Sequence, residues 1–434
     1  MNLRILLLAV LAMTLGGQAQ ETVRGEPIDL PTVLRLAGAQ GIDVEIAEAR
    51  LREARAAAES STWALFPTIS PGVGYRNHTG QAQSFAGPVS DVNKESVNAG
   101  ATLFLSLDLG EAVYRRLAAK QTAQAAEHGL AAQRRQTVLQ ATLAYFDLAK
   151  SHQSVALLED SVRTAKDYHG QIGQAVQLGL AFKGDELRAF AQVSRLEVRL
   201  RQAQDQRRGD AARLAQLLRL NIAESLVPAD DRPLPLTLVD THRKLDALVQ
   251  GALNRRPEVL EAGALREAAQ HQDDAARYAP LYPTLGAQVF AGGLGGSTSS
   301  TRRDFGNSTD TYVTLSWKIG AGGLFDSART EGAEARLRQT SLAETKTHDE
   351  IVRQVVEGQA HVTYLGQQLK IGEEAVRAAE QGYKLSLGRK EFAVGIVLEA
   401  LQSQQDLIQA RLDYANTVGE SNKAQAKLRN ATGE

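Results

Sequence analysis

The sequence predicts a mixed α and transmembrane β fold, in which long α-helical coiled coils join a β-barrel and the same arrangement occurs twice along the chain. Three observations lead to this prediction. The phrase LFPTI at residues 65–69 returns as LYPTL at residues 281–285. Proline is missing from two very long stretches, one on each side of the second phrase. Short segments after each phrase alternate apolar and polar residues, as membrane-spanning β-strands do.

Composition excludes several classes of protein. The 434-residue chain has a formal net charge of -1 and contains no cysteine. A nearly neutral chain gives no electrostatic reason to expect a nucleic acid partner. Without cysteine there can be no disulfide, thiolate metal site, cysteine nucleophile or lipid-modified N-terminal cysteine.

The first element is a secretory signal peptide, predicted over residues 1–19. Arg4 supplies its positive charge, residues 5–15 form a short apolar core, and Gly17-Gln18-Ala19 provides small residues for cleavage. The alternative is a membrane anchor, but a spanning helix needs an apolar run of about 20 residues. We therefore expect an exported protein from which the signal peptide is removed.

The repeat extends well beyond the LFPTI phrase. Thr102-Leu103 matches Thr314-Leu315, and Gly179 matches Gly395, at nearly the same offset. Chance similarity would not keep this register, so we expect two copies of one structural unit, at residues 20–220 and 245–434. Three prolines interrupt residues 221–244 and predict an irregular link, which we expect to pack outside the helices midway along them. The alternative for this link is a disordered linker.

Each copy is expected to contain a very long helix. No proline occurs between Pro88 and Pro228 or after Pro283, and apolar residues recur there at steps of three and four. An uninterrupted helix from about residue 110 to 179 would span roughly 100 Å. A plain coiled-coil rod would show the same pattern, so the helices alone do not decide the fold.

Each copy also predicts a β-hairpin, at residues 68–107 and 284–319. Alternation over about ten residues matches a transmembrane strand, although each strand alone would also suit a hairpin on a soluble core. The joining segments, residues 79–93 and 292–309, are rich in Gly, Ser, Gln and Asn and are predicted to be external loops. The side chains predicted to face lipid are Val97, Leu103, Leu105, Val313, Leu315 and Trp317. Those predicted to face the lumen are Asn98, Thr102, Thr314 and Lys318.

Four strands cannot form a closed barrel. Open strand edges are not tolerated in lipid, because their N–H and C=O groups find no water there. Several copies of the chain must therefore share one barrel. Two copies would give eight strands and a filled interior, whereas three would give twelve strands and room for a channel.

These features together resemble the TolC family of outer membrane efflux proteins. The resemblance rests on the duplicated ALFPTIS-type phrase, on the strand-to-helix turns LSLDLGEAV and SWKIGAGGLFDSAR, and on the turn GLAFKGDELRA that begins at Gly179. It implies a homotrimer with four strands per protomer, and thus a twelve-stranded outer membrane barrel continuous with a helical periplasmic tunnel. It also implies a passive exit duct for small molecules or proteins, which docks on a periplasmic adaptor and an inner membrane transporter. The missing cysteine departs from lipid-anchored members and indicates a chain that is not lipidated.

The resemblance also implies functional residues at the two turns farthest from the membrane. It places the periplasmic aperture at Glu399 and Gln402, where the second position has lost the charge. It places adaptor-docking turns at Gly179, Asp185 and Gly395. The alternative for Glu399 is a simple surface pair with Arg389 or Lys390.

No catalytic, cofactor or metal site is predicted. The eight histidines are scattered, and no pair has the spacing of a zinc motif. The competing hypothesis to a channel is a periplasmic coiled-coil adaptor or scaffold without a membrane barrel. Such a protein would not need two matched hairpins with an apolar outer face.

Overall fold

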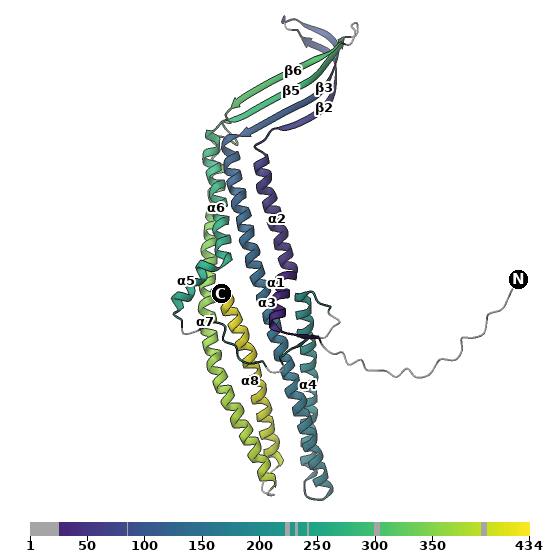
Figure 1. The fold of residues 1–434 in the computed structure, drawn as a ribbon, viewed down its shortest axis with the longest axis vertical. Coiled ribbons are helices and arrows are strands. Elements are labelled where there is room, and N and C mark those ends of the chain that lie inside the picture. Colours follow the sequence, from purple (N-terminus) through teal and green to yellow (C-terminus); the bar gives the residue numbers. More distant parts are fainter. Residues whose placement is uncertain are drawn as a thin grey trace, which may run out of the picture.

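The computed structural model describes residues 26–84, 86–221, 226–230, 233–240, 243–298, 304–391 and 397–434. The predicted signal peptide at residues 1–19 lies outside these ranges, as does Gly395. The described chain is mostly helical and carries one four-stranded sheet at one end (Figure 1).

The same order of elements occurs twice. The first series is α1 (Leu30–Gln40), α2 (Ile42–Trp63), β2 (Thr68–Gln83), β3 (Val89–Asp108), α3 (Leu109–Gln177) and α4 (Lys183–Leu218). The second series is α5 (Leu245–Arg255), α6 (Pro257–Tyr278), the short 3-10 helix η1 (Ala279–Leu281), β5 (Thr284–Thr298), β6 (Asp304–Ser316), α7 (Ser327–Glu391) and α8 (Val397–Thr432). Corresponding helices have equal lengths of 11, 22 and 36 residues, apart from α3 with 69 and α7 with 65.

The long helix α3 begins and ends where its sequence favours a boundary. The Asp108 carboxylate accepts a hydrogen bond from the backbone N–H of Glu111 at 3.2 Å, which caps the first turn. At the other end Gly179 adopts a left-handed φ of +73°, a conformation in which a side chain is strained. Between these points the 69 residues run without interruption, as the missing prolines predict.

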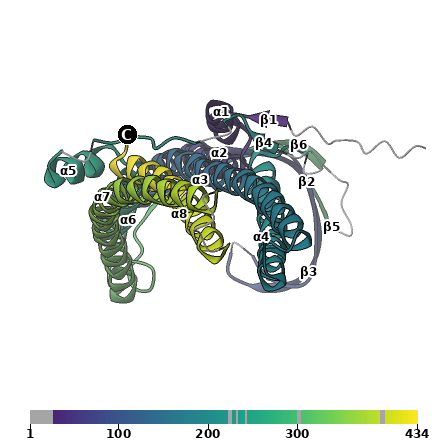
Figure 2. The ribbon, with the colours of Figure 1, turned by 90° about the horizontal axis from the view of Figure 1, so that it is seen from below.

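The helices form a curved wall. In the half nearer the sheet, the contacts place α2, α3, α6 and α7 side by side, and in the far half they place α4, α3, α8 and α7 in the same way. Viewed along the helices, this wall is an arc, with α1 and α5 on its convex side (Figure 2). The end of α3, the end of α7 and the first residues of α4 and α8 all lie at the end opposite the sheet (Figure 1).

The sheet has the strand order β2-β3-β5-β6, and every neighbouring pair is antiparallel. Each hairpin follows its repeated phrase directly, because Pro67 precedes β2 and Pro283 precedes β5. Proline is acceptable at this position since the strand has not yet begun. The phrase therefore marks the point where an incoming helix gives way to a strand.

The prediction of long external loops within the two hairpins is wrong, because strands occupy most of those segments. Most of residues 79–93 and, among the described positions, of residues 292–309 belong to strands that extend the hairpins. Backbone ladders need no apolar side chains, so polar residues continue a hairpin beyond its apolar part. Gly87, with a φ of +96°, lies in the short turn that remains between β2 and β3.

The segment between the two series contains a short strand, although the sequence analysis predicted only an irregular link there. β4 (Leu226–Pro228) pairs in parallel with β1 (Glu26–Ile28). Further on, buried Asn422 of α8 accepts from the Leu236 N–H at 2.8 Å and donates to the Leu234 carbonyl at 3.0 Å. The described part of this segment thus packs against α8, midway along the molecule (Figure 1).

Small side chains hold the wall together. Ala141, Ala144 and Leu148 of α3 are almost fully buried and belong to a cluster with α1 and α4. A second cluster joins Leu248 of α5 to Val355 of α7. Alanine allows neighbouring helices to approach closely, so a wall one helix thick still buries a continuous apolar seam.

Candidate functional site

The register of the sheet brings the predicted lipid-facing residues of the strands to one face. Side chains of directly opposed residues in a sheet share a face, and successive residues alternate. Leu105 is opposite Ala287, and Ala287 is opposite Val313. Odd-numbered residues of all four strands therefore share one face, which carries Val97, Leu103, Leu105, Val313 and Leu315 together with Ile69, Val73, Tyr75 and Val289.

The opposite face is more polar. It carries Asn98 and Thr102 of β3 and Thr314 of β6, and also Gln288 and the aromatic Phe104. Two predicted residues fall outside the strands, because β6 ends at Ser316 before Trp317 and Lys318. Lys318 instead lies 3.9 Å from the carboxylate of Asp108 at the sheet–helix junction.

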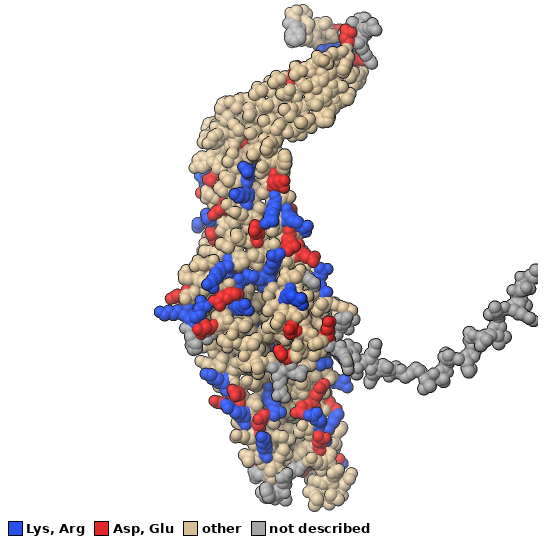
Figure 3. Space-filling model, in the orientation of Figure 1, with Lys and Arg blue, Asp and Glu red and all other residues tan. Residues whose placement is uncertain are grey.

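Large apolar side chains on the odd-numbered face are open to the surroundings. Val73 is 80% exposed and Val313 is 65% exposed. Lysine, arginine, aspartate and glutamate cover the helices but are sparse over most of the sheet surface in view (Figure 3). A contiguous exposed apolar surface of this kind is typical of contact with lipid or another protein.

The turn between α3 and α4 presents apolar side chains at the far end of the molecule. Leu178, Leu180 and Phe182 are each at least 74% exposed, and Gly179 lies between the first two. Asp185, which was expected in this turn, instead lies in the first turn of α4 and pairs with Arg188 at 3.3 Å. The sequence analysis missed the apolar residues, although LGLAF contains no polar side chain.

Glu399 and Gln402 lie on α8 beside the matching turn, whose residues 392–396 fall outside the described chain. Both side chains are exposed, and Gln402 donates to the Asp406 carboxylate at 3.1 Å. The side chains of Arg389 and Lys390 also lie outside the described part, so the alternative pairing of Glu399 is not tested.

Behind these turns lies a small buried cluster that links both helix pairs. Tyr168 and Ile172 of α3 and Ala189 of α4 pack with Ala400 and Leu401 of α8. Burial removes water from the Tyr168 hydroxyl, disfavours its anion and raises the pKa of Tyr168 to about 12. The cluster holds the residues around Asp185 and Glu399 in fixed relation to each other.

The described residues contain no cluster of His, Cys, Asp and Glu suited to a metal ion. Within the same residues, no helix combines the length and the hydropathy that a membrane span requires.

A family model described as "Outer membrane efflux protein" matches residues 33–218 and 248–434, which is most of the chain. The chain belongs to the outer membrane efflux protein family. This membership confirms the resemblance found in the sequence and does not favour an adaptor or scaffold without a barrel. The outer membrane efflux proteins are transport proteins rather than enzymes.

Solved structures show the same fold. The outer-membrane channel OprN is similar with a TM-score of 0.80 and 19% identity, covering 93% of this chain and 89% of its own. The CmeC outer membrane channel of Campylobacter jejuni has a TM-score of 0.81 at 15% identity, with 93% and 85% covered. VceC of Vibrio cholerae, an outer membrane protein, has a TM-score of 0.76 at 19% identity, with 93% and 96% covered. No curated protein sequence gives a significant match to this outer membrane efflux protein.

Proposed function

We propose that three copies of this outer membrane efflux protein form a channel that crosses the outer membrane and continues as a tunnel through the periplasm. The observation that carries the proposal is the open sheet. Among the described strands, β2 and β6 each have one neighbour and leave one edge unpaired. Such an edge is not tolerated in lipid, so β6 of one copy pairs with β2 of the next. Three copies give a twelve-stranded barrel, and two would give a barrel too narrow for a channel.

The curvature of the helical wall supports the same assembly. Within the described chain, each helix at an end of the arc packs against a neighbour on one side only, and such an arc becomes a closed tunnel when copies join by cyclic symmetry (Figure 2). The odd-numbered face of the sheet then contacts lipid, including Val97, Leu103 and Leu105, with Trp317 beside it. The more polar face, with Asn98 and Thr102, lines the channel.

The far end of the tunnel is the proposed contact with other components of the export system. The exposed apolar side chains around Gly179 suit a helical hairpin of a periplasmic adaptor, and Asp185 at the start of α4 and Gly395 of the second repeat complete the proposed docking surface. Glu399 and Gln402 narrow the aperture on the inner side, and an inner membrane transporter supplies the exported molecules. Energy comes from that transporter, so the duct itself is passive.

The remaining features complete the proposal. The signal peptide at residues 1–19 directs export and is removed, and the mature chain is not lipidated because it has no cysteine. The repeats at residues 20–220 and 245–434 each contribute one hairpin and one long helix pair, joined by the equatorial segment 221–244.

Cross-linking tests the trimer. Because the natural chain has no cysteine, a disulfide between two copies can form only through the cysteines introduced on β2 and, in turn, along β6. We expect oxidation in membranes to give covalent species of two and three protomers. A purified protein that light scattering shows as one or two protomers, with no species of three, contradicts the proposal. Conductance of the purified protein in a planar lipid bilayer tests the channel itself.

A further inference from the structure

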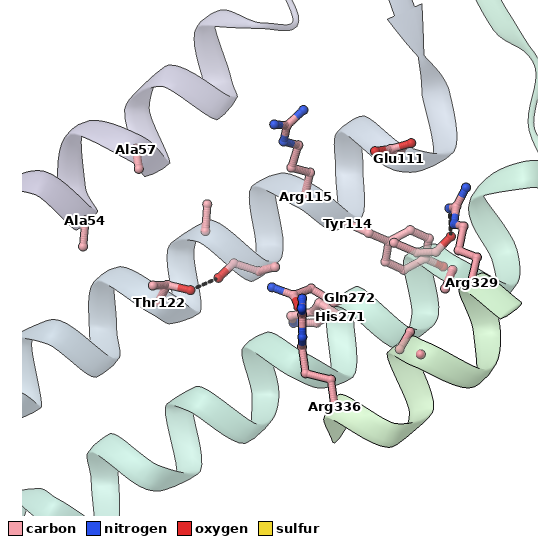
Figure 4. Close-up of a pocket in the computed structure, with 16 residues that line it drawn as sticks. Ala54, Ala57, Glu111, Tyr114, Arg115, Thr122, His271, Gln272, Arg329 and Arg336 are labelled. Carbon is pink, nitrogen blue, oxygen red and sulfur yellow. Dashed lines mark hydrogen bonds between the residues drawn. The ribbon is translucent and has the colours of Figure 1, made fainter. Parts of the chain in front are cut away.

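A groove of about 730 Å³ lies near the sheet, and it is lined by the four neighbouring helices α2, α3, α6 and α7. Figure 4 views this groove from the concave side of the arc, since α2, α3, α6 and α7 appear there in the reverse of their order in Figure 1. Three arginines from two helices line it: Arg115 of α3, and Arg329 and Arg336 of α7.

None of these three guanidinium groups lies within ion-pair distance of a carboxylate of the described residues, although the Asp326 carboxylate accepts from the backbone N–H of Arg329 at 3.0 Å and partly offsets the charge of that arginine. Arg336 donates to the side-chain oxygen of Gln272 at 3.2 Å, and Arg329 donates to the backbone carbonyls of Ala275 and Gly322. The exposed Arg115 has no hydrogen-bond partner among the described residues. By contrast, other arginines of the same helices, such as Arg134 with Glu48, are paired with acids.

The groove is therefore a positively charged surface. Glu111 is the one acidic residue among the described residues that line it, against three guanidinium groups. A guanidinium carries five N–H donors in a fork that matches carboxylate and phosphate oxygens, and most of these donors are unused here. Small neighbours such as Ala118 and Ala276 leave room above the helices for a solute.

We propose that this groove binds solutes that carry two or more anionic groups, such as carboxylates or phosphates. The proposal rests on the proposed function, because the groove faces the lumen only if the concave side lines the tunnel. In a trimer the groove occurs three times at one level, just before the solute enters the barrel. The three grooves together form a ring of arginines that concentrates anions where the tunnel meets the barrel. Glu399, by contrast, favours cations at the periplasmic aperture.

Binding of inorganic tripolyphosphate to the purified protein tests the groove directly. We expect Arg115→Gln and Arg336→Gln each to weaken binding by roughly tenfold, the loss typical of one charge-assisted hydrogen bond. Glu111→Gln should tighten binding, because it removes the opposing charge. Arg338→Gln is the matched control, since two residues along a helix correspond to a rotation of about 200°, away from the groove. Binding should also weaken in 1 M salt, where the Debye length is about 3 Å.

Four results would overturn the proposal. The first two are no tripolyphosphate binding by the natural protein at low salt, and unchanged binding in both Arg115→Gln and Arg336→Gln. The other two are an equal loss of binding in Arg338→Gln, and binding that does not weaken in 1 M salt. Conductance separates this proposal from the function on which it rests. If the natural protein conducts but Arg115→Gln does not change its anion preference, the channel function stands and the proposed anion site is wrong. If the natural protein binds tripolyphosphate through these arginines but never conducts, the anion site stands and the proposed channel function is wrong.

Discussion

A charge placed on Leu103 should block assembly of the barrel. Leu103 lies five residues before the end of β3 at Asp108, where the helical wall begins. At about 3.3 Å per residue and a strand tilt of about 40°, its side chain lies about 13 Å from that junction. This is close to the middle of an apolar band about 25 Å tall, where arginine on the lipid face costs about 2–4 kcal/mol. The cost corresponds to a roughly 30- to 900-fold lower assembly constant for each protomer.

Thr102→Arg is the matched control, since Thr102 is the adjacent residue on the opposite face of the same strand. The assay measures the fraction of each variant that reaches the outer membrane as a trimer resistant to SDS before heating. We expect Leu103→Arg to be depleted and Thr102→Arg to assemble almost normally. Equal assembly of the two variants would refute the assignment of faces, and depletion of Thr102→Arg alone would show that the faces are reversed.

Three other changes test the helical part. Asn422→Ala removes two part-buried hydrogen bonds to the backbone of Leu234 and Leu236, each worth about 0.5–1.5 kcal/mol, so we expect a loss of about 1–3 kcal/mol in unfolding free energy and faster proteolysis of residues 233–240; unchanged proteolysis contradicts this role of Asn422. Glu399→Gln should lower cation preference and relieve block by multivalent cations in single-channel recordings, and an effect of Asp185→Asn instead would show that the two turns are assigned the wrong way round. Burial raises the pKa of Tyr168 to about 12, above its usual value of about 10, so its stabilisation is complete below pH ~10 and is lost as the pH rises towards 12. In Tyr168→Phe, the melting temperature should decrease less between about pH 10 and 12 than in the natural protein. An identical decrease in both proteins contradicts the role of Tyr168 in this pH dependence.

Much of the fold follows from local signals in the sequence. The absence of proline after Pro88 predicts α3, because one proline would have broken that helix. The alternation around Leu103 and Val313 predicts strands, and the observed register places both residues on one face. These patterns are strong because they repeat over many residues and occur in both halves of the chain.

Features that depend on contacts between distant segments could not be predicted. β4 exists because Leu226 lies beside Glu26 in the folded chain, and neither sequence shows a strand pattern of its own. The arginine groove joins Arg115 to Arg336, which no local periodicity relates. The end of β6 at Ser316 was also missed, since the alternation of Trp317 and Ile319 continues after the backbone pairing stops.

The strand order has a consequence for how the chain folds. Each hairpin forms between neighbouring segments, but the sheet is complete only when β3 pairs with β5, and their partners Asp108 and Thr284 are 176 residues apart. Contacts at such a separation form slowly, because the entropy of closing a long loop must be overcome first. The edge of β3 must therefore stay unpaired until the second hairpin has been synthesised. We expect this waiting state to be the stage at which the protein is most prone to aggregate and most in need of a periplasmic chaperone.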